Sequence, residues 1–272
     1  LRTLGGTITL SEGTATADLD ADAAVVAHGS GNIFLQAAGA GTDIVANANA
    51  DIQSTTGHLT LKAARTINLA VSVDVTTAAA GTQDLVASTG SLVMAPTATL
   101  QTVNGDIRIT VGDDVLDQVV IGDITASNAN VSLVTTGSVL DADPAADSDI
   151  DITARGLRIV AGKGVGLLAN NSLTAPVNAL ETTVDTLSVH ARGSDGINIV
   201  ETDAVAINDV ISPLDATKSA TVQTVQADAT TSTTTEVTQS DLVTSNENGA
   251  NGSIVLRTLG GTITLSEGTA TA

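Results

Sequence analysis

Short apolar strands recur along the chain at a nearly constant spacing, and this short period constrains the fold more than any other feature. Many strands follow the pattern Gly-x-apolar-x-apolar, as in residues 31–35 (GNIFL), 57–61 (GHLTL), 105–109 (GDIRI) and 252–256 (GSIVL). The first apolar residues of these strands lie 26, 26, 22, 24, 26, 30, 35 and 32 positions apart. A fixed period of this length indicates a repetitive architecture. The series is Ile33, Leu59, Leu85, Ile107, Val131, Leu157, Leu187, Val222 and Ile254.

Each period contains further strands with Gly, Asn, Asp or Ser between them. A second strand begins a few residues after the first, and a third follows in most periods. Short strands with turn residues at the corners fit the three sides of a coil, and stacked coils pair each strand with its equivalent one coil later. We therefore predict an all-β, right-handed parallel β-helix of about nine coils with three short strands each. The second strands are expected at Ile44, Ile67, Leu92, Val115, Val139, Val165, Ile197 and Ile263.

The composition supports stacked coils over immunoglobulin-like sandwiches. The chain has one Phe, no Trp and no Tyr, although 42% of its residues are hydrophobic. Sandwich domains of about 100 residues usually place a large aromatic side chain in the core. Thin, regular layers of Ala, Val, Ile and Leu suit a solenoid better.

A long repeat contains the short one. Residues 1–17 (LRTLGGTITLSEGTATA) return without substitution as residues 256–272, 255 positions later. Exposed Thr, Ser and Ala positions would drift if the fold alone preserved them, so the identity indicates recent duplication. We expect a single β-solenoid segment over 1–272, in which 1–255 is one tandem unit and 256–272 begins the next copy. The alternative is an overlap without any natural array.

At the level of pattern and composition, the chain resembles filamentous-haemagglutinin-type exoproteins and other giant bacterial surface adhesins. The resemblance rests on the recurring Gly-x-Ile-x-Leu strands and covers nearly the full length. It implies a secreted or surface-exposed fibre with a role in adhesion or cell–cell contact. The strong acidity and the perfect 255-residue recurrence depart from the family pattern and weaken the transfer of any receptor or secretion route.

The charge restricts the partners. The net charge is −20, from 30 acidic and 10 basic residues. Nucleic acid needs a basic footprint, and anionic lipid repels such a chain. No apolar run is long enough for a membrane span. We expect identical repeats as the main partners, other cell surfaces as further partners, and an extracellular or cell-surface location whose signal peptide would lie outside this sequence.

Acidic clusters offer the best candidate metal ligands. Alternate Asp residues in a turn can supply the hard oxygen ligands that calcium prefers. The loop between Asp141 and Asp151 (DADPAADSDID) is the strongest case, and the clusters at residues 18–22 and 113–117 are weaker. Solvated corner residues that keep strands apart explain the same clusters without a metal. The calcium hypothesis assigns the ligands Asp141, Asp143, Asp147 and Asp149.

The remaining candidates favour structural roles. His28, His58 and His190 lie in different periods, so we expect surface or corner positions and no metal site. Carboxylate pairs will occur by chance, but a sugar-cleaving groove also needs stacking aromatics, so we expect no enzyme and no cofactor. The Thr- and Ser-rich stretch 217–251 is expected to be irregular or weakly packed. The leading function is a structural repeat of a filament or adhesin shaft, and the alternative is a surface that binds calcium, glycan or an ordered surface.

Overall fold

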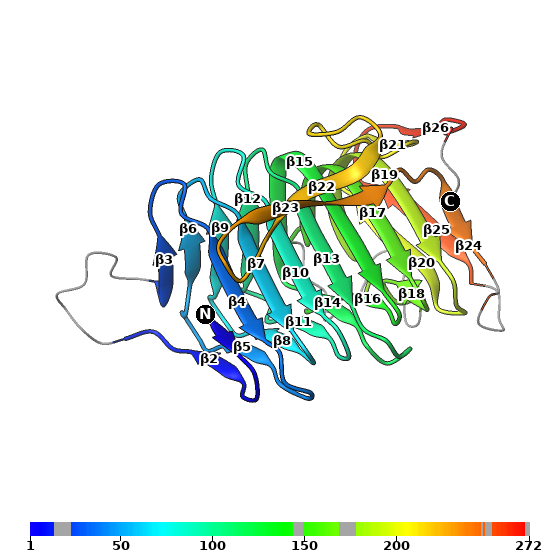
Figure 1. The fold of residues 1–272 in the computed structure, drawn as a ribbon. Helices are drawn as coiled ribbons and strands as arrows, with labels where there is room; N and C mark the ends of the chain where they lie inside the picture. The colour runs from blue at the N-terminus through cyan, green and yellow to red at the C-terminus, as the bar shows by residue number, and fades with distance from the viewer. Residues whose placement is uncertain (14–22, 144–148, 169–177, 246, 248–251, 270–272) are drawn as a thin grey trace.

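The chain folds into a parallel β-solenoid. The computed structural model describes residues 1–13, 23–143, 149–168, 178–245, 247 and 252–269, and these ranges contain strands and no helix. Of the 26 described strands, 24 join one parallel sheet that winds round a long axis (Figure 1). The other two, β22 (Lys218–Val225) and β23 (Thr231–Val237), form an antiparallel hairpin of their own. The predicted β-helical architecture is confirmed at this level.

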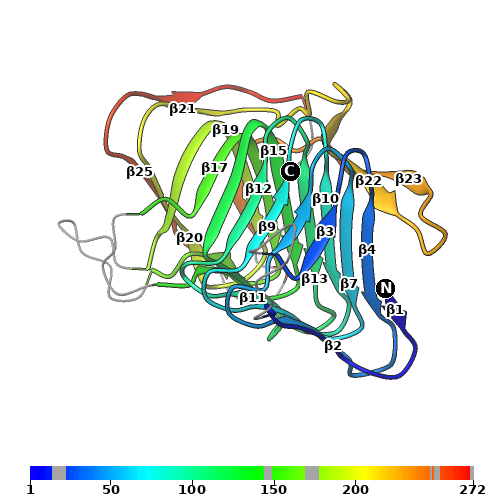
Figure 2. The ribbon, with the colours of Figure 1, turned by 90° about the vertical axis from the view of Figure 1, so that its left-hand side faces the viewer.

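The strands stack in three columns, which Figure 2 shows from one end of the solenoid. In the first column, strands pair in parallel from one coil to the next with little change of register. Its members are β1 (Arg2–Thr3), β4 (Ile33–Ala37), β7 (Leu59–Ala63), β10 (Gln83–Ala87), β13 (Ile107–Val111), residues 131–135 of β15 (Asp123–Thr135), residues 157–161 of β17 (Ile152–Ala161) and residues 187–191 of β19 (Leu180–Ala191).

The second and third columns complete each coil. The second contains β2 (Ile8–Leu10), β5 (Ile44–Ala46), β8 (Ile67–Leu69), β11 (Leu92–Met94), β14 (Val119–Ile121), β16 (Val139–Asp141), β18 (Gly164–Val165) and the start of β20 (Gly196–Glu201). The third contains β3 (Val25–Ala27), β6 (Ile52–Ser54), β9 (Asp74–Thr77), β12 (Thr99–Thr102) and the first parts of β15, β17 and β19.

The Gly of the recurring pattern marks a corner where neighbouring coils touch. A Cβ atom on Gly57 would lie 2.0 Å from the carbonyl oxygen of Gly31, and one on Gly105 would lie 1.9 Å from that of Gly81. Only glycine allows the backbone of one coil to approach the next so closely. The pattern Gly-x-apolar-x-apolar therefore reports a stacked corner followed by a first-column strand.

Inward side chains of all three columns form one aliphatic core. Alternate residues of β4 show the pattern: Ile33, Leu35 and Ala37 are buried, while Phe34 points outward. The same alternation holds for β5, β8, β11 and β13. Because each layer repeats the previous one, small aliphatic side chains fill the interior without an aromatic residue.

The register differs from the sequence prediction at one coil. Gln83, rather than Leu85, pairs with Leu59 and Ile107, so residues 81–85 (GTQDL) carry the recurring pattern with Gln in an apolar position. Gln83 is fully buried. Its amide Nε2 donates to the carbonyl oxygens of Val75 at 2.8 Å and Gln101 at 2.9 Å, whereas its buried Oε1 has no hydrogen-bond partner among the described residues.

Four other predicted strands take different places, and one of them, at Ile263, pairs with β21 (Val205–Ile207) beside the first column instead of lying in the second. The second-column strand of the fifth coil is β14, and Val115 lies in an exposed corner (44% exposed). Val222 belongs to the hairpin and forms no coil. Ile254 pairs with Ile197 of the second column, where the short period alone placed it in the first. Apolar-x-apolar runs look alike in every column, so spacing could not separate these cases.

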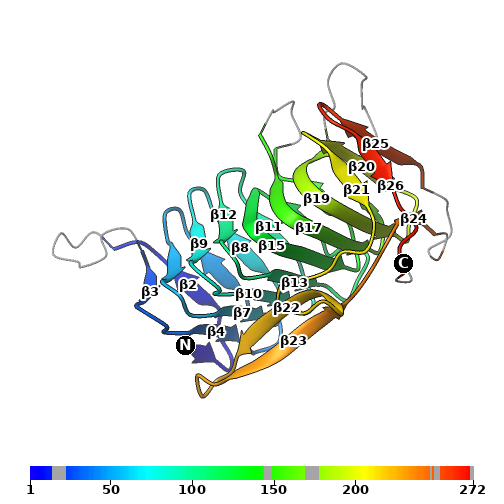
Figure 3. The same cartoon turned by 90° about the horizontal axis from the view of Figure 1, so that it is seen from above.

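The hairpin interrupts a strand of the solenoid. Leu187 pairs with Ile207 at the end of β21, and Val189 pairs with Leu242 at the start of β24 (Leu242–Thr244). Residues 208–240 are thus inserted within one first-column strand. They contain the hairpin, which lies along the outer face of β7, β10, β13 and β15 (Figure 3). The Thr- and Ser-rich stretch 217–251, predicted to be irregular or weakly packed, accordingly includes three described strands, β22, β23 and β24.

Candidate functional site

The hairpin is fixed to the solenoid by hydrogen bonds to four successive coils. Strand β22 crosses the first column, and alternate residues meet side chains from one coil after another. Buried polar groups of this kind must be paired, and here each pairs with a main-chain group of the hairpin. The bonds run from Val225 N to Thr60 Oγ1 (2.8 Å), Gln223 N to Thr82 Oγ1 (2.8 Å), Thr221 N to Asp106 Oδ2 (2.7 Å) and Asn130 Nδ2 to Ser219 O (2.8 Å).

Asp106 is the central anchor. Its carboxylate is fully buried and accepts hydrogen bonds from the backbone N–H of Asn130 and of Thr221 and from the hydroxyl of Ser212. Burial raises the pKa of Asp106, while these bonds and the charge of Arg155 act in the opposite direction. One carboxylate thus connects the next coil and two points of the insertion.

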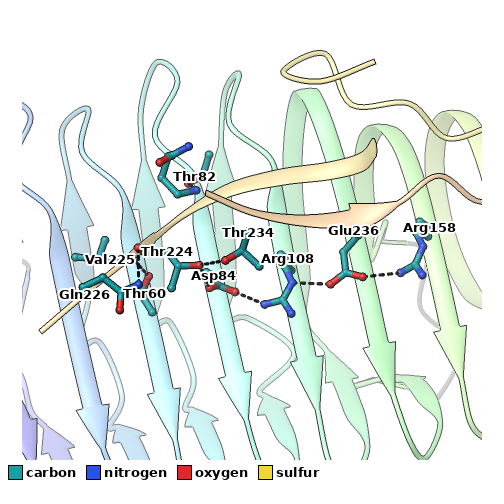
Figure 4. A network of polar contacts seen from close by, with 11 residues as sticks. Thr60, Thr82, Asp84, Arg108, Arg158, Thr224, Val225, Gln226, Thr234 and Glu236 are labelled. Carbon is teal, nitrogen blue, oxygen red and sulfur yellow. Dashed lines mark hydrogen bonds and ion pairs between the residues drawn. The ribbon is translucent and has the colours of Figure 1, made fainter. Parts of the chain in front are cut away.

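A row of alternating charges lies beneath the hairpin (Figure 4). Asp84 Oδ1 accepts from Arg108 Nη1 at 2.8 Å, and Arg108 Nε donates to Glu236 Oε1 of β23 at 2.6 Å. Arg158 Nη1 lies 3.5 Å from the other oxygen of Glu236. Thr224 of β22 donates to Asp84 Oδ2 at 2.6 Å. The hairpin therefore supplies the one carboxylate that separates two arginines of the solenoid.

Burial affects the two arginines differently. Desolvation lowers the pKa of Arg108, but the neighbouring Asp84 and Glu236 raise it by more, so its net pKa is raised. For Arg158 desolvation prevails, and its pKa is lowered. Arg158 also donates to Ser132 Oγ at 3.1 Å. Glu236 is consequently most important for Arg158, for which no other carboxylate partner is found among the described residues.

An open groove of about 490 Å³ lies between the hairpin turn and the first column. Phe34, the one aromatic residue of the chain, lines it together with the cations Arg2, Lys62 and Arg108. Among the described residues, Arg2 and Lys62 form no ion pair. Three of the ten basic residues of a strongly acidic chain thus face one groove.

The third column carries an acidic ladder, which we define as the residues in the position just before its first inward residue. The register of β6, β9, β12, β15, β17 and β19 stacks these positions on successive coils, about 4.8 Å apart. Like charges at this spacing repel and disfavour ionisation. The ladder consists of Asp51, Asp74, Thr99, Asp123, Asp151 and Glu181.

Hydrogen bonds to the next coil offset part of this repulsion. Asp74 N donates to Asp51 Oδ1 at 2.8 Å, and Thr99 Oγ1 donates to Asp74 Oδ1 at 2.6 Å. Burial still raises the pKa of Asp51 and of Asp123. The ladder therefore holds its acids through main-chain and hydroxyl donors, without a described cation beside it.

The end of the ladder brings three carboxyl groups together. Asp141, Asp151 and Glu181 each place an oxygen within 4.8 Å of the other two. Asp151 is 5% exposed and accepts the backbone N–H of Glu181 at 2.7 Å. Burial, followed by the charge of Asp141, raises the pKa of Asp151 to about 10. Burial also raises the pKa of Asp141. The group can share protons among its oxygens or hold a hard cation.

Of the predicted calcium ligands that the structure describes, this arrangement includes one. Asp141 is in the buried group, whereas Asp143 and Asp149 are exposed. Asp143 N donates to Asp141 Oδ1 at 2.7 Å, and the charge of Asp149 contributes to the raised pKa of Asp141. Asp147 lies outside the described residues. Among the described residues, the structure brings Asp151 and Glu181 to Asp141.

The histidines occupy separate places. His28 is exposed in a corner, and His58 lies at the corner before β7, where its Nδ1 accepts the backbone N–H of Thr82 at 3.2 Å. Desolvation lowers the pKa of His58 and of His190. His190 Nε2 lies 3.1 Å from Ser245 Oγ. None of the three is part of the carboxyl group described above.

Sequence reasoning missed the acidic ladder, the hairpin anchors and the groove. The ladder had a readable signal, because Asp precedes an apolar residue followed by a polar one at Asp51, Asp74, Asp123 and Asp151 with nearly the coil period. The anchors had none, since Asp106 and Thr221 are 115 residues apart and meet only through the inserted hairpin.

The described residues contain no helix that could cross a lipid bilayer. Comparisons with protein-family models, curated proteins and solved structures found no match to the chain.

Proposed function

We propose that the chain is a structural repeat of an extracellular or cell-surface filament, an adhesin shaft in which identical units continue end to end. The observation that carries the proposal is the contrast between the two copies of the duplicated segment. Leu10 is 8% exposed beneath the following coil, whereas its copy Leu265 is 77% exposed on the last described strand, β26 (Ile263–Leu265). A surface that packs beneath a following coil in one copy can accept a following coil in the other.

The stacking supports a mechanical role. Each coil pairs with its neighbours through main-chain hydrogen bonds, so stability is close to a sum of nearest-neighbour contributions and length can grow by addition of units. Coils of 24 to 30 residues are typical of the right-handed form that we propose here. About nine strand spacings would add about 43 Å per 255-residue unit. The net charge of −20 would keep neighbouring shafts apart.

The test is electron microscopy of a two-unit chain, residues 1–255 joined directly to residues 1–272. We expect a single rod about 43 Å longer than the one-unit chain, from nine strand spacings. Two particles joined by a visible gap, or a compact particle of unchanged length, would overturn the proposal.

A second candidate function is binding of an acidic saccharide in the groove beneath the hairpin turn. The favouring observation is the meeting of Phe34 with the cations Arg2 and Lys62, which form no ion pair with the residues that the structure describes. An aromatic face can stack on a sugar ring, and Arg or Lys can pair with its carboxylate. Titration with an oligomer of galacturonic acid should show binding that Lys62→Gln weakens and the matched single-charge control Lys218→Gln retains. Equal binding by both variants would exclude the groove.

A further inference from the structure

The duplicated segment occurs twice in the structure, and each copy pairs along a different edge of its strands. In its first copy, β1 pairs with Gln36 and Ala37 of β4, and β2 pairs with β5. In its second copy, residues 257–258 of β25 (Ile254–Thr258) pair with residues 200–201 of β20. Strand β26 pairs with β21. In the first copy the partner follows in the chain, and in the second it precedes, so one segment can hold both partners at once.

We infer that successive units join by sharing this segment, with a shift of one column at each join. In the joined chain, β25 lies between β20 of one unit and β4 of the next. In the same way, β26 lies between β21 of one unit and β5 of the next. This inference rests on the proposed filament and specifies how its units meet.

The residues before the duplicated segment fit the same join. Continuing the register Arg2–Gln36 backward aligns residues 252–258 (GSIVLRT) with residues 31–37 (GNIFLQA). Both stretches have Gly at the corner, Ile at the first inward position and Leu at the second. The strand β25 therefore matches β4 in pattern while it pairs with β20 in space.

The shift follows from the columns of the two partners. Strand β4 belongs to the first column of its unit. Residues 199–201 of β20 pair with residues 180–182 of β19, which lie in the third column, and β21 pairs with residues 186–187 in the first. The second column of one unit thus continues the first column of the unit before it. Its first column continues β20, which runs from the second column, where Ile197 pairs with Val165, into the third. A unit is one column short of a whole number of turns.

This join differs from one made of whole turns. Nine complete coils would return Ile263 to the second column, beside Ile197. The structure instead pairs Ile197 with Ile254 and Ile263 with Val205. With a one-column shift, the hairpins of successive units face three directions in turn, and the pattern repeats every three units, or about every 125 Å.

Paired cysteines test the join in the single chain, which has no cysteine of its own. Ala206 and Thr264 are register partners, and neighbouring strand positions lie within the Cα separation that a disulfide accepts. We expect Ala206→Cys with Thr264→Cys to oxidise to a disulfide under mild conditions. The matched pair Asn198→Cys with Thr264→Cys would oxidise only with whole turns, and we expect it to stay reduced. Oxidation of the second pair alone, or of neither pair, would overturn the inference.

Microscopy of a chain of six units separates this inference from the proposed function. A rod with hairpins on three faces and an axial repeat of about 125 Å supports the shift. A rod with all hairpins on one face and a repeat of about 43 Å would overturn the shift and leave the filament standing. Absence of a rod would overturn the filament, and the cysteine pairs would still report the register of the duplicated segment.

Discussion

The first and third columns place charges in the same geometry and reach opposite results. Stacking brings equivalent positions of successive coils to about 4.8 Å in both columns. Beneath the hairpin, Asp84, Arg108 and Arg158 alternate with Glu236, so each charge has an opposite neighbour. In the acidic ladder, carboxyl groups stack on one another and burial raises the pKa of Asp51, Asp123 and Asp151. In a solenoid, side chains at a repeated position lie next to one another on successive coils, so the charges that the sequence places there either attract or repel along the whole column.

The largest expected effect comes from the anchor of the first column. Asp106→Ala leaves the backbone N–H groups of Asn130 and Thr221 and the hydroxyl of Ser212 without their acceptor. We expect a loss of about 3–5 kcal/mol in the free energy of unfolding, measured by urea denaturation. Hydrogen exchange should show faster exchange along β22. The exposed Asp113→Ala is the control and should change stability by less than about 0.5 kcal/mol.

Breaking the alternation of charge should cost less. Glu236→Ala removes the carboxylate between Arg108 and Arg158 and leaves two partly buried cations adjacent. We expect a loss of about 2 kcal/mol, since unpaired buried charge is costly. Glu247→Ala, whose ion pair with Arg192 is about half exposed, is the comparison and should be nearly neutral. Equal losses of unfolding free energy in the two variants would show that the row of charges contributes no more to stability than a half-exposed ion pair.

Removal of a charge from the acidic ladder should raise the stability of the fold, whereas the two variants above lower it. The folded chain keeps a proton on Asp151 up to about pH 10, whereas the unfolded chain releases it near pH 4. Unfolding between these values releases a proton, so stability should fall as pH rises through this window. Burial raises the pKa of Glu201 to about 7, which adds a decline of the same sign at lower pH.

Asp151→Asn should therefore raise stability at pH 8 by about 1–2 kcal/mol and flatten its pH dependence. The amide oxygen can keep the bond from Glu181 N, so the fold retains this contact. The exposed Asp149→Asn serves as the control. Denaturation curves at pH 4 and pH 8 give the comparison, and lower stability of Asp151→Asn at pH 8 would contradict the assignment.

Calcium gives the smallest expected effect. The calcium hypothesis for Asp141, Asp143, Asp147 and Asp149 stays a prediction. If a site with millimolar affinity forms there, 5 mM calcium should stabilise the chain by about 1 kcal/mol. Loss of the effect in Asp143→Asn with Asp149→Asn would place the ion in the loop, whereas loss in Glu181→Gln would place it in the buried group. An unchanged melting temperature would exclude calcium.

The coils could be predicted from the sequence because the corner before many first-column strands accepts only glycine. Gly57 and Gly105 cannot carry a side chain beside the preceding coil, so the first column is marked by glycine. The hairpin lacks such a mark. Residues 231–235 (TSTTT) are uniformly polar and show no apolar–polar alternation, and only contacts across the fold make β22 and β23 antiparallel.

The candidate site was less accessible to sequence reasoning. Asp141 was identified from local acidity, but its partners Asp151 and Glu181 come from later coils and depend on register. A register shift of two residues, as at Gln83, leaves the alternation of inward and outward residues intact. The apolar–polar pattern therefore identifies the inward and outward faces of a strand more reliably than it identifies the residues that pair with the strand on the next coil.

The inserted hairpin also bears on how the chain folds. Contacts within the solenoid join residues about one coil apart, whereas Val225 meets Thr60 across 165 positions. Contacts of such long sequence separation form late, because the loop must close before they contribute. Docking of β22 requires the coils of Thr60, Thr82, Asp106 and Asn130 to be stacked in register already. The hairpin can therefore dock only on coils that are stacked in the correct register. A slip of one coil during folding would leave β22 without its hydrogen-bond partners.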